Sequence, residues 1–155
     1  MKKTNAARIL DRLKINYELI EYQVDESDLS AVHLAETAGI PIGNVFKTLV
    51  LEGDKIGNFV CIIPGSEEID LKKAAVESGN KKVTLIKMKD LEPLTGYIRG
   101  GCSPLGMKKY FPVYIDDTAF NLSLIYISAG VRGMQIKLPP ADLMVACSAN
   151  KATLI

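Results

Sequence analysis

Two apolar segments separated by a short polar stretch dominate the first half of the chain. Residues 45–51 (VFKTLVL) and 58–63 (NFVCII) are rich in branched aliphatic side chains, and the intervening residues 52–57 (EGDKIG) include two glycines. Branched and aromatic residues favour strands, and a short linker containing glycine suits a hairpin. The pattern therefore predicts a buried β-hairpin at 45–63.

Helices and further strands are expected on both sides of this hairpin. Helices are predicted at 4–14, 31–38, 71–78, 89–94 and 141–147, and strands at 17–22, 83–86, 113–115, 124–128 and 134–138. Ser30 and Asp70 are suited to cap the second and third helices, because their side chains can accept hydrogen bonds from free helix N–H groups. Hairpins mixed with helices predict an α+β fold with a mixed, mostly antiparallel sheet, and the length favours one domain over 1–155.

Lys47 interrupts the apolar run of the first hairpin strand. An ammonium group is rarely buried without a partner, since its desolvation is costly. One interpretation is that Lys47 faces a cleft or an anionic ligand. The other is that it lies on the outer face of an edge strand, with its stem on apolar surface. The segment alone leaves both open.

Composition excludes several classes of protein. The formal net charge of +1 disfavours a DNA-binding protein or a polybasic membrane binder. No segment reaches the ~20 apolar residues that cross a bilayer, and charged side chains at 8–14 leave no signal-peptide core, so we expect a cytoplasmic protein. The three cysteines lack a C-x-x-C pair and there is one histidine, so we expect neither a metal site nor a cofactor.

The segment 100–106 (GGCSPLG) could form a binding loop, because glycines let backbone N–H groups converge on an anion or a carbonyl oxygen. It matches neither a P-loop, which needs Lys where Met107 stands, nor a nucleophile elbow, which needs Gly where Leu105 stands. Catalysis by Cys102 would require a base, and the one histidine, His33, lies far away in sequence. Cys102 is therefore better interpreted as a small side chain packed in the protein interior.

A second glycine segment, 128–133 (SAGVRG), has two interpretations. It is either a hairpin turn with a surface arginine, or a cleft wall in which Ser128 faces the ligand while Arg132 braces a loop or contacts phosphate. The basic residues of the middle of the chain form either a solvated surface or a diffuse RNA-binding patch. They are Lys72, Lys73, Lys81, Lys82, Lys87, Lys89, Arg99, Lys108 and Lys109.

Three motifs occur in order: Lys47-Thr48, Gly100-Gly101-x-Ser103-Pro104-Leu105-Gly106, and Ser128-x-Gly130-x-Arg132-Gly133. Together they resemble the YbaK/EbsC family of the bacterial prolyl-tRNA editing superfamily, from the first helix to about Asp142. The resemblance implies one α+β domain with a barrel-like sheet flanked by helices. It also implies a deacylase that clears mischarged tRNA beside prolyl-tRNA synthetase, without DNA or membrane partners.

The glycine motif is similar to the branch that acts on Cys-tRNA(Pro). Alternatives are a deacylase for Ala-tRNA(Pro) or another mischarged tRNA, or a non-catalytic module that binds tRNA or synthetase. In the Cys-tRNA branch the cysteinyl thiol attacks its own ester, so the protein needs no nucleophile. Editing is needed because a binding pocket discriminates near-isosteres by only ~1–3 kcal/mol.

The resemblance also implies roles for single residues. Lys47 would bind the tRNA end and polarise the ester, and the backbone N–H of Gly101 would stabilise the oxyanion. The expected substrate-binding residues are Tyr22, Thr48, Gly100, Ser103, Ser128, Arg132 and Asp142. Relatives often carry Phe where this chain has Ser30, and Leu29 or Val32 would then form that wall of the pocket.

Overall fold

The computed structural model describes residues 3–155, so residues 1 and 2 of the expected domain lie outside the described part. Within that part the chain forms five α-helices, α1 (Asn5–Arg12), α2 (Ala31–Ala38), α3 (Leu71–Ser78), α4 (Met88–Thr95) and α5 (Pro140–Ala146). Two short 3-10 helices are η1 (Ile42–Asn44) and η2 (Asp117–Asn121). The strands are β1 (Glu18–Glu21), β2 (Phe46–Gly53), β3 (Gly57–Pro64), β4 (Val83–Leu85), β5 (Val113–Asp116), β6 (Ile125–Ser128), β7 (Met134–Leu138) and β8 (Asn150–Ala152).

Helix boundaries follow local capping chemistry. The Ser30 side chain accepts a hydrogen bond from the N–H of His33, and that of Asp70 accepts from the N–H groups of Lys72 and Lys73. Helices α2 and α3 both end at a glycine in the left-handed conformation, which residues with a Cβ adopt reluctantly. The predicted helix starts at 31 and 71 are thereby confirmed.

The strands form two sheets that face a common core. One sheet has the order β1-β7-β6 and the other β4-β2-β3-β5-β8, with parallel pairing only where β5 joins β3 and β8. A parallel bridge between Val45 and Tyr126 connects the two sheets. The α+β class with mixed sheets is confirmed. Strand β8 was not predicted, because its three residues pair only with a strand far away in sequence.

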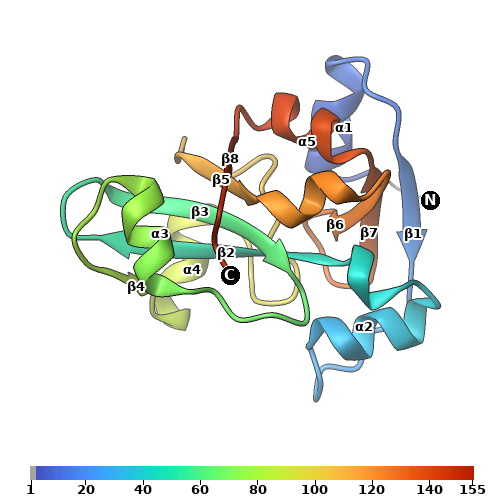
Figure 1. Ribbon diagram of the computed structural model, residues 1–155. Helices are drawn as coiled ribbons and strands as arrows, with labels where there is room; N and C mark the ends of the chain where they lie inside the picture. The colour runs from blue at the N-terminus through green and yellow to red at the C-terminus, as the bar shows by residue number, and fades with distance from the viewer. Residues whose placement is uncertain (1–2) are drawn as a thin grey trace.

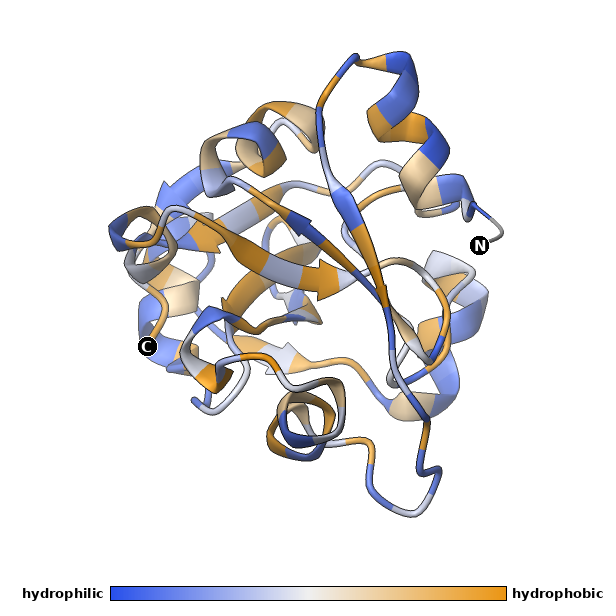
Figure 2. Ribbon diagram, turned by 90° about the vertical axis from the view of Figure 1, so that its right-hand side faces the viewer, coloured by the Kyte–Doolittle hydropathy of each residue, from blue (hydrophilic) through white to orange (hydrophobic). Residues whose placement is uncertain are grey.

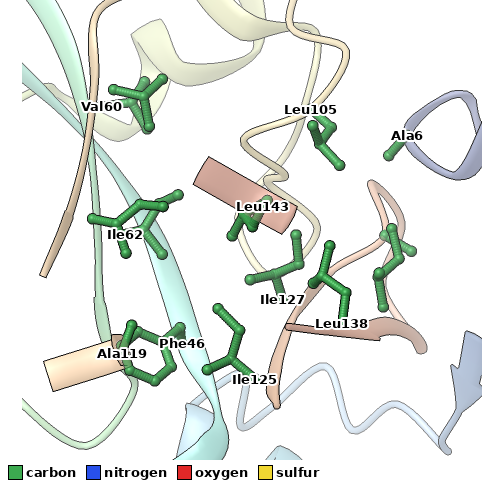
Figure 3. Close-up of a cluster of buried hydrophobic side chains, with 14 of the residues drawn as sticks. Ala6, Phe46, Val60, Ile62, Leu105, Ala119, Ile125, Ile127, Leu138 and Leu143 are labelled. Carbon is green, nitrogen blue, oxygen red and sulfur yellow. The ribbon is translucent and has the colours of Figure 1, made fainter. Parts of the chain in front are cut away.

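The main core lies between the two sheets. Figure 3 shows Ile125 of one sheet beside Phe46 of the other, with Ile127 and Leu138 near Leu143 in the same cluster. Helices α1 and α5 close this core through Leu10 and Leu143, each fully buried. In Figure 2 the central strands are mostly hydrophobic, and the helices alternate between hydrophobic and hydrophilic stretches. No helix in residues 3–155 combines the length and the apolar character needed to cross a bilayer.

The long strand β2 has one incompletely paired edge. Along its other edge β2 pairs with β3 from Phe46 to Gly53, whereas β4 pairs only with residues 51–53. The bridge from Val45 to β6 lies at the opposite end of the strand. Among residues 3–155, no strand fills the gap between β4 and β6 along residues 47–50, although the Ile86 N–H donates to the Val50 carbonyl oxygen at 3.2 Å. Figure 1 shows α2 beside one end of β2 and α4 beside the other.

Strand β8 is held in place by a buried carboxylate. Asp116 is fully buried, and its Oδ1 accepts from the Leu154 N–H at 2.8 Å. Its Oδ2 accepts from the backbone N–H and the hydroxyl of Thr118. The carboxylate therefore fixes the start of η2 and the C-terminal segment together.

Replacing Asp116 by alanine is expected to lower the free energy of unfolding by about 2 kcal/mol or more, since a buried N–H left without an acceptor costs ~1–3 kcal/mol. The urea midpoint measures this, with the slope unchanged if compactness is kept. Asp117→Ala is the matched control, because Asp117 bonds only the exposed Thr153 hydroxyl and its loss should cost less than ~1 kcal/mol. Equal midpoints for the two variants would contradict the role of Asp116.

Candidate active site

A cavity of about 460 Å³ opens at the gap along β2. Its walls come from the unpaired stretch of β2, the start of α2, the connection from β4 to α4, the first glycine segment, and the ends of β6 and β7. These segments are widely separated in sequence. The cavity therefore exists only when both sheets and α2 are in place.

Three polar side chains form a row across the strands on the cavity side. In strands, alternate residues share a face, so Lys47 points to the same side as Val45. Val45 bridges Tyr126, Lys47 and Ser128 each follow two residues after this bridge, and Ser128 pairs with Gln135. All three line the cavity. They present an ammonium, a hydroxyl and an amide in succession.

Lys47 is half-buried, and its ammonium group forms no salt bridge or hydrogen bond with any of residues 3–155. Burial lowers the pKa of Lys47, and the charges of Glu68 and Glu67 oppose that shift. Lys87 and Arg99 also line the cavity, whereas no carboxylate of the described chain does. The site is thus electropositive and suited to an anionic ligand. Of the two interpretations of Lys47, the structure supports the cleft.

Two polar atoms in the cavity wall lack hydrogen-bond partners. They are the Thr48 Oγ1 and the Gln135 Oε1, both fully buried and both unpartnered within residues 3–155. Thr48 points to the opposite face of β2 from Lys47, toward the main core, and reaches the cavity because that edge of the strand is open. A buried polar group without a partner lowers the stability of the fold, so such groups are rare. Where they occur at a cavity, a ligand can supply the missing hydrogen bond.

The first glycine segment corrects one prediction. Gly100 has φ +83°, the value typical of the third residue of a type II turn. Gly100 also lines the cavity. The N–H of Gly101, however, donates to the Ile98 carbonyl oxygen at 3.0 Å, so it is not available to an oxyanion. A Cβ on Gly101 would lie 3.2 Å from backbone atoms of Val131 and Arg132. Gly101 is small because the two glycine segments pack against each other.

Arg132 and Ser103 stabilise this loop pair and do not line the cavity. The Arg132 Nε donates to the Arg99 carbonyl oxygen at 2.8 Å, and its Nη1 lies 3.8 Å from the Glu26 carboxylate. Arg132 therefore braces three segments, which is one of its two predicted roles. Ser103 is fully buried, and its Oγ accepts from the Leu105 N–H.

Two further predicted residues lie away from the cavity. Tyr22 follows β1 and donates its N–H to the Gly133 carbonyl oxygen at 2.9 Å, without contributing to the cavity wall. Asp142 lies in the first turn of α5, against the other side of the core. Of the predicted site residues, Lys47, Thr48, Gly100 and Ser128 are brought together.

The apolar wall comes from the turn before α2 and from α2 itself. Leu29, Ala31 and Leu34 line the cavity, so Leu29 takes the wall position expected of it. Val32 does not contribute, because it is 47% exposed on the outer face of α2. Gln135 was missed by the sequence analysis. A polar residue inside the apolar strand 134–138 was the available signal, as it was for Lys47.

The histidine and the cysteine nearest the motifs show no catalytic geometry. His33 faces Asp25 and Asp28, each at 3.8 Å, on the surface. Cys102 lines the cavity, but burial raises the pKa of its thiol to about 12. Because only a thiolate is strongly nucleophilic, Cys102 is inert near neutral pH. Within residues 3–155 no group of three His, Cys, Asp or Glu side chains is arranged to hold a metal ion.

Thiol reactivity tests this assignment. Burial raises the pKa values of Cys61, Cys102 and Cys147 to about 12, so their thiolate fractions stay negligible at pH 8 and rise only at much higher pH. We expect iodoacetamide at pH 8 to modify all three cysteines in urea but none in the native protein over the same time, as measured by mass spectrometry. Rapid native labelling of Cys102 would show that its thiol is activated.

The fold and the site define a class of protein: an α+β domain with a cavity lined by cationic side chains and no activated nucleophile among the described lining residues. The family model for the aminoacyl-tRNA editing domain matches residues 26–146, and the chain belongs to this family. A relative from Enterococcus faecalis, EbsC, is 52% identical over 143 residues, which cover 92% of this chain and 87% of the relative. Its name describes it as a candidate Cys-tRNA(Pro)/Cys-tRNA(Cys) deacylase.

More distant relatives support the fold. The protein YwhH of Bacillus subtilis is 27% identical over 121 residues, covering 78% of this chain and 76% of YwhH. The crystal structure of a candidate trans-editing enzyme for prolyl-tRNA synthetase aligns with a TM-score of 0.82 at 23% identity, covering 99% of this chain and 98% of that one. A hypothetical protein aligns with a TM-score of 0.88 at 19% identity, covering 97% of this chain and 99% of the other.

Proposed function

We propose that this chain is a trans-editing deacylase that clears mischarged Cys-tRNA(Pro). The observation that carries the proposal is the unpaired, half-buried Lys47 in the wall of a cavity without carboxylates. Such an ammonium needs an anionic or strongly polar ligand, and the end of an acylated tRNA supplies phosphate and ester oxygens. The name of the Enterococcus relative supports cysteine as the amino acid removed.

The size of the cavity fits the acylated terminal nucleoside of a tRNA. Ligand pockets typically span ~300–1,000 Å³, and this cavity of about 460 Å³ lies within that range. The remainder of the tRNA would stay outside. A net charge of +1 provides little general attraction for RNA, so tRNA choice would depend on a partner, for which prolyl-tRNA synthetase is the natural candidate.

The chemistry that we propose is the one that the family resemblance implies, and the lack of an activated nucleophile among the described cavity residues is consistent with it. The thiol sulfur of the bound cysteinyl group attacks its own ester carbonyl carbon, and the carbon–oxygen bond to the ribose breaks. The products are a cyclic thiolactone and the free tRNA terminus, and the proton lost by sulfur is balanced by the one gained by the ribose oxygen. The protein contributes position and charge stabilisation, which are effective when groups are held in fixed geometry.

Lys47 and backbone donors stabilise the oxyanion in this scheme. The N–H groups of Gly100 and Cys102 adjoin the cavity and have no acceptor within residues 3–155. We assign them the role that Gly101 cannot fill. Lys47, which also lines the cavity, binds the terminal phosphate or the ester oxygen.

The decisive assay uses purified protein with Cys-tRNA(Pro), Ala-tRNA(Pro) and Pro-tRNA(Pro). Rapid loss of the cysteinyl form alone supports the proposal, and loss of the alanyl form alone would indicate the alanine-clearing alternative. Binding of charged tRNA without any loss would indicate a non-catalytic module. Release of the thiolactone, detected by mass spectrometry, separates attack by the thiol from attack by water.

A further inference from the structure

Gln135 has the environment of a ligand-contacting residue that no motif identifies. Its side chain is only 3% exposed and lines the cavity, and its Oε1 has no partner within residues 3–155. No residue in 3–155 bonds the Gln135 Oε1, so the packing of the empty protein gives this oxygen no role. A buried amide without partners destabilises the empty protein, and a ligand group that bonds it recovers that cost.

The cavity has many hydrogen-bond donors and few free acceptors. Lys47, Lys87 and Arg99 supply donors, and no carboxylate of the described chain lines the wall. The two serine hydroxyls of the wall already accept: Ser30 from the His33 N–H and Ser128 from the Gly130 N–H. Of the side-chain acceptors in the wall, the buried ones that have no partner at all within residues 3–155 are those of Gln135 and Thr48.

An acylated adenosine brings a donor that needs such an acceptor. Its carbonyl and phosphate oxygens match the cationic side chains of the wall, but its α-amino group is a strong donor that meets no carboxylate among the described lining residues. The thiol is a much weaker donor and would not compensate a buried amide. Because the terminal amide torsion is broad and roughly two-fold, a half-turn presents the oxygen or the nitrogen of Gln135 to the cavity.

We propose that the Gln135 amide oxygen binds the α-amino group of the aminoacyl ligand and so positions the acyl group. Lys47 on β2 and Gln135 on β7 both line the cavity, and Gln135 is paired with Ser128 of β6. The anionic end of the ligand lies toward Lys47 and its amino end toward Gln135. The proposal rests on the proposed function, in that it takes an acylated adenosine as the ligand.

Binding experiments test this without turnover. Two non-hydrolysable probes are used, adenosine analogues that carry cysteine or 3-mercaptopropionate in amide linkage at the 3′ position. They differ only in the α-amino group. We expect wild type to bind the cysteine probe about 10-fold or more tightly than the des-amino probe, because a hydrogen bond to an amino group, charged when protonated, is worth several-fold to 100-fold in affinity.

Gln135→Met should remove that preference by weakening only the cysteine probe. Gln135→Glu keeps an acceptor and should retain the preference, while Gln23→Met, an exposed glutamine outside the cavity, should leave both affinities unchanged. Because each preference is a ratio within one preparation, partial misfolding cancels. Equal weakening of both probes in Gln135→Met, or no preference in wild type, overturns the proposal. The tRNA assay above reports separately on the proposed function.

Discussion

Lys47→Ala is expected to reduce kcat/KM for deacylation of Cys-tRNA(Pro) by about 100-fold or more, the range found when one transition-state donor is lost. The same substitution should not lower the free energy of unfolding. Lys47 has no partner within residues 3–155, so its removal relieves desolvation and breaks no bond. Loss of activity without loss of stability distinguishes a ligand-binding lysine from a structural one.

Three substitutions serve as controls for Lys47. Lys109→Ala removes an exposed lysine outside the cavity, and Cys102→Ala and His33→Ala remove the two side chains that could have formed a thiol–imidazole pair. All three should retain most of the activity. Activity close to wild type in Lys47→Ala would contradict the assignment, as would inactivity in Cys102→Ala with an unchanged urea midpoint.

Gly65→Ala should reduce both stability and activity. A Cβ on Gly65 would lie 2.5 Å from the Cβ of Ala31, the first residue of α2, and 3.2 Å from the Val45 carbonyl oxygen. Overpacking of this kind costs ~1–3 kcal/mol. Helix α2 would have to move away from the sheet, and displacements of ~1 Å at a site can cost up to ~100-fold in rate. Urea unfolding and kcat/KM measure the two effects.

Gly43→Ala is the matched control for Gly65→Ala. A Cβ on Gly43 would meet nothing within 4 Å, and neither glycine has a positive φ, so the two substitutions differ in the space around the new Cβ and in that Gly65 alone of the two lines the cavity. Gly43→Ala should leave midpoint and rate within error of wild type. If both variants behaved alike, α2 would not be seated on Gly65 as described.

Local signals in the sequence were sufficient for most helices and for the central hairpin. Ser30 and Asp70 cap helices through bonds to residues two or three positions away, and the hairpin at 45–63 brings together strands adjacent in sequence. Strand β8 depends on parallel pairing with β5 and on the carboxylate of Asp116, more than 30 residues earlier. No local pattern in three residues encodes such a partner.

Residues of the site could be predicted where a polar or charged side chain interrupts an otherwise apolar strand. Lys47 stood out because it is charged within an apolar strand, and its position in the cavity follows from that misfit. Gln135 gave the same signal, but alternation of polar and apolar residues in a strand is ordinarily explained by a solvent-facing side. The role expected of Gly101 failed for another reason: the direction of its N–H is set by the turn from Ile98, which residue identity does not reveal.

The gap along β2 also bears on self-association. An unpaired strand edge is a template on which a second molecule can add a strand, and proteins prevent this with short edges and with charge, especially lysine. Here the vacant edge is only a few residues long, lies between β4 and β6, and begins at Lys47. The Lys47 ammonium, which we propose binds the substrate, would therefore also hinder the addition of a strand from a second molecule. An apolar replacement of Lys47 would remove both the substrate contact and this barrier to aggregation.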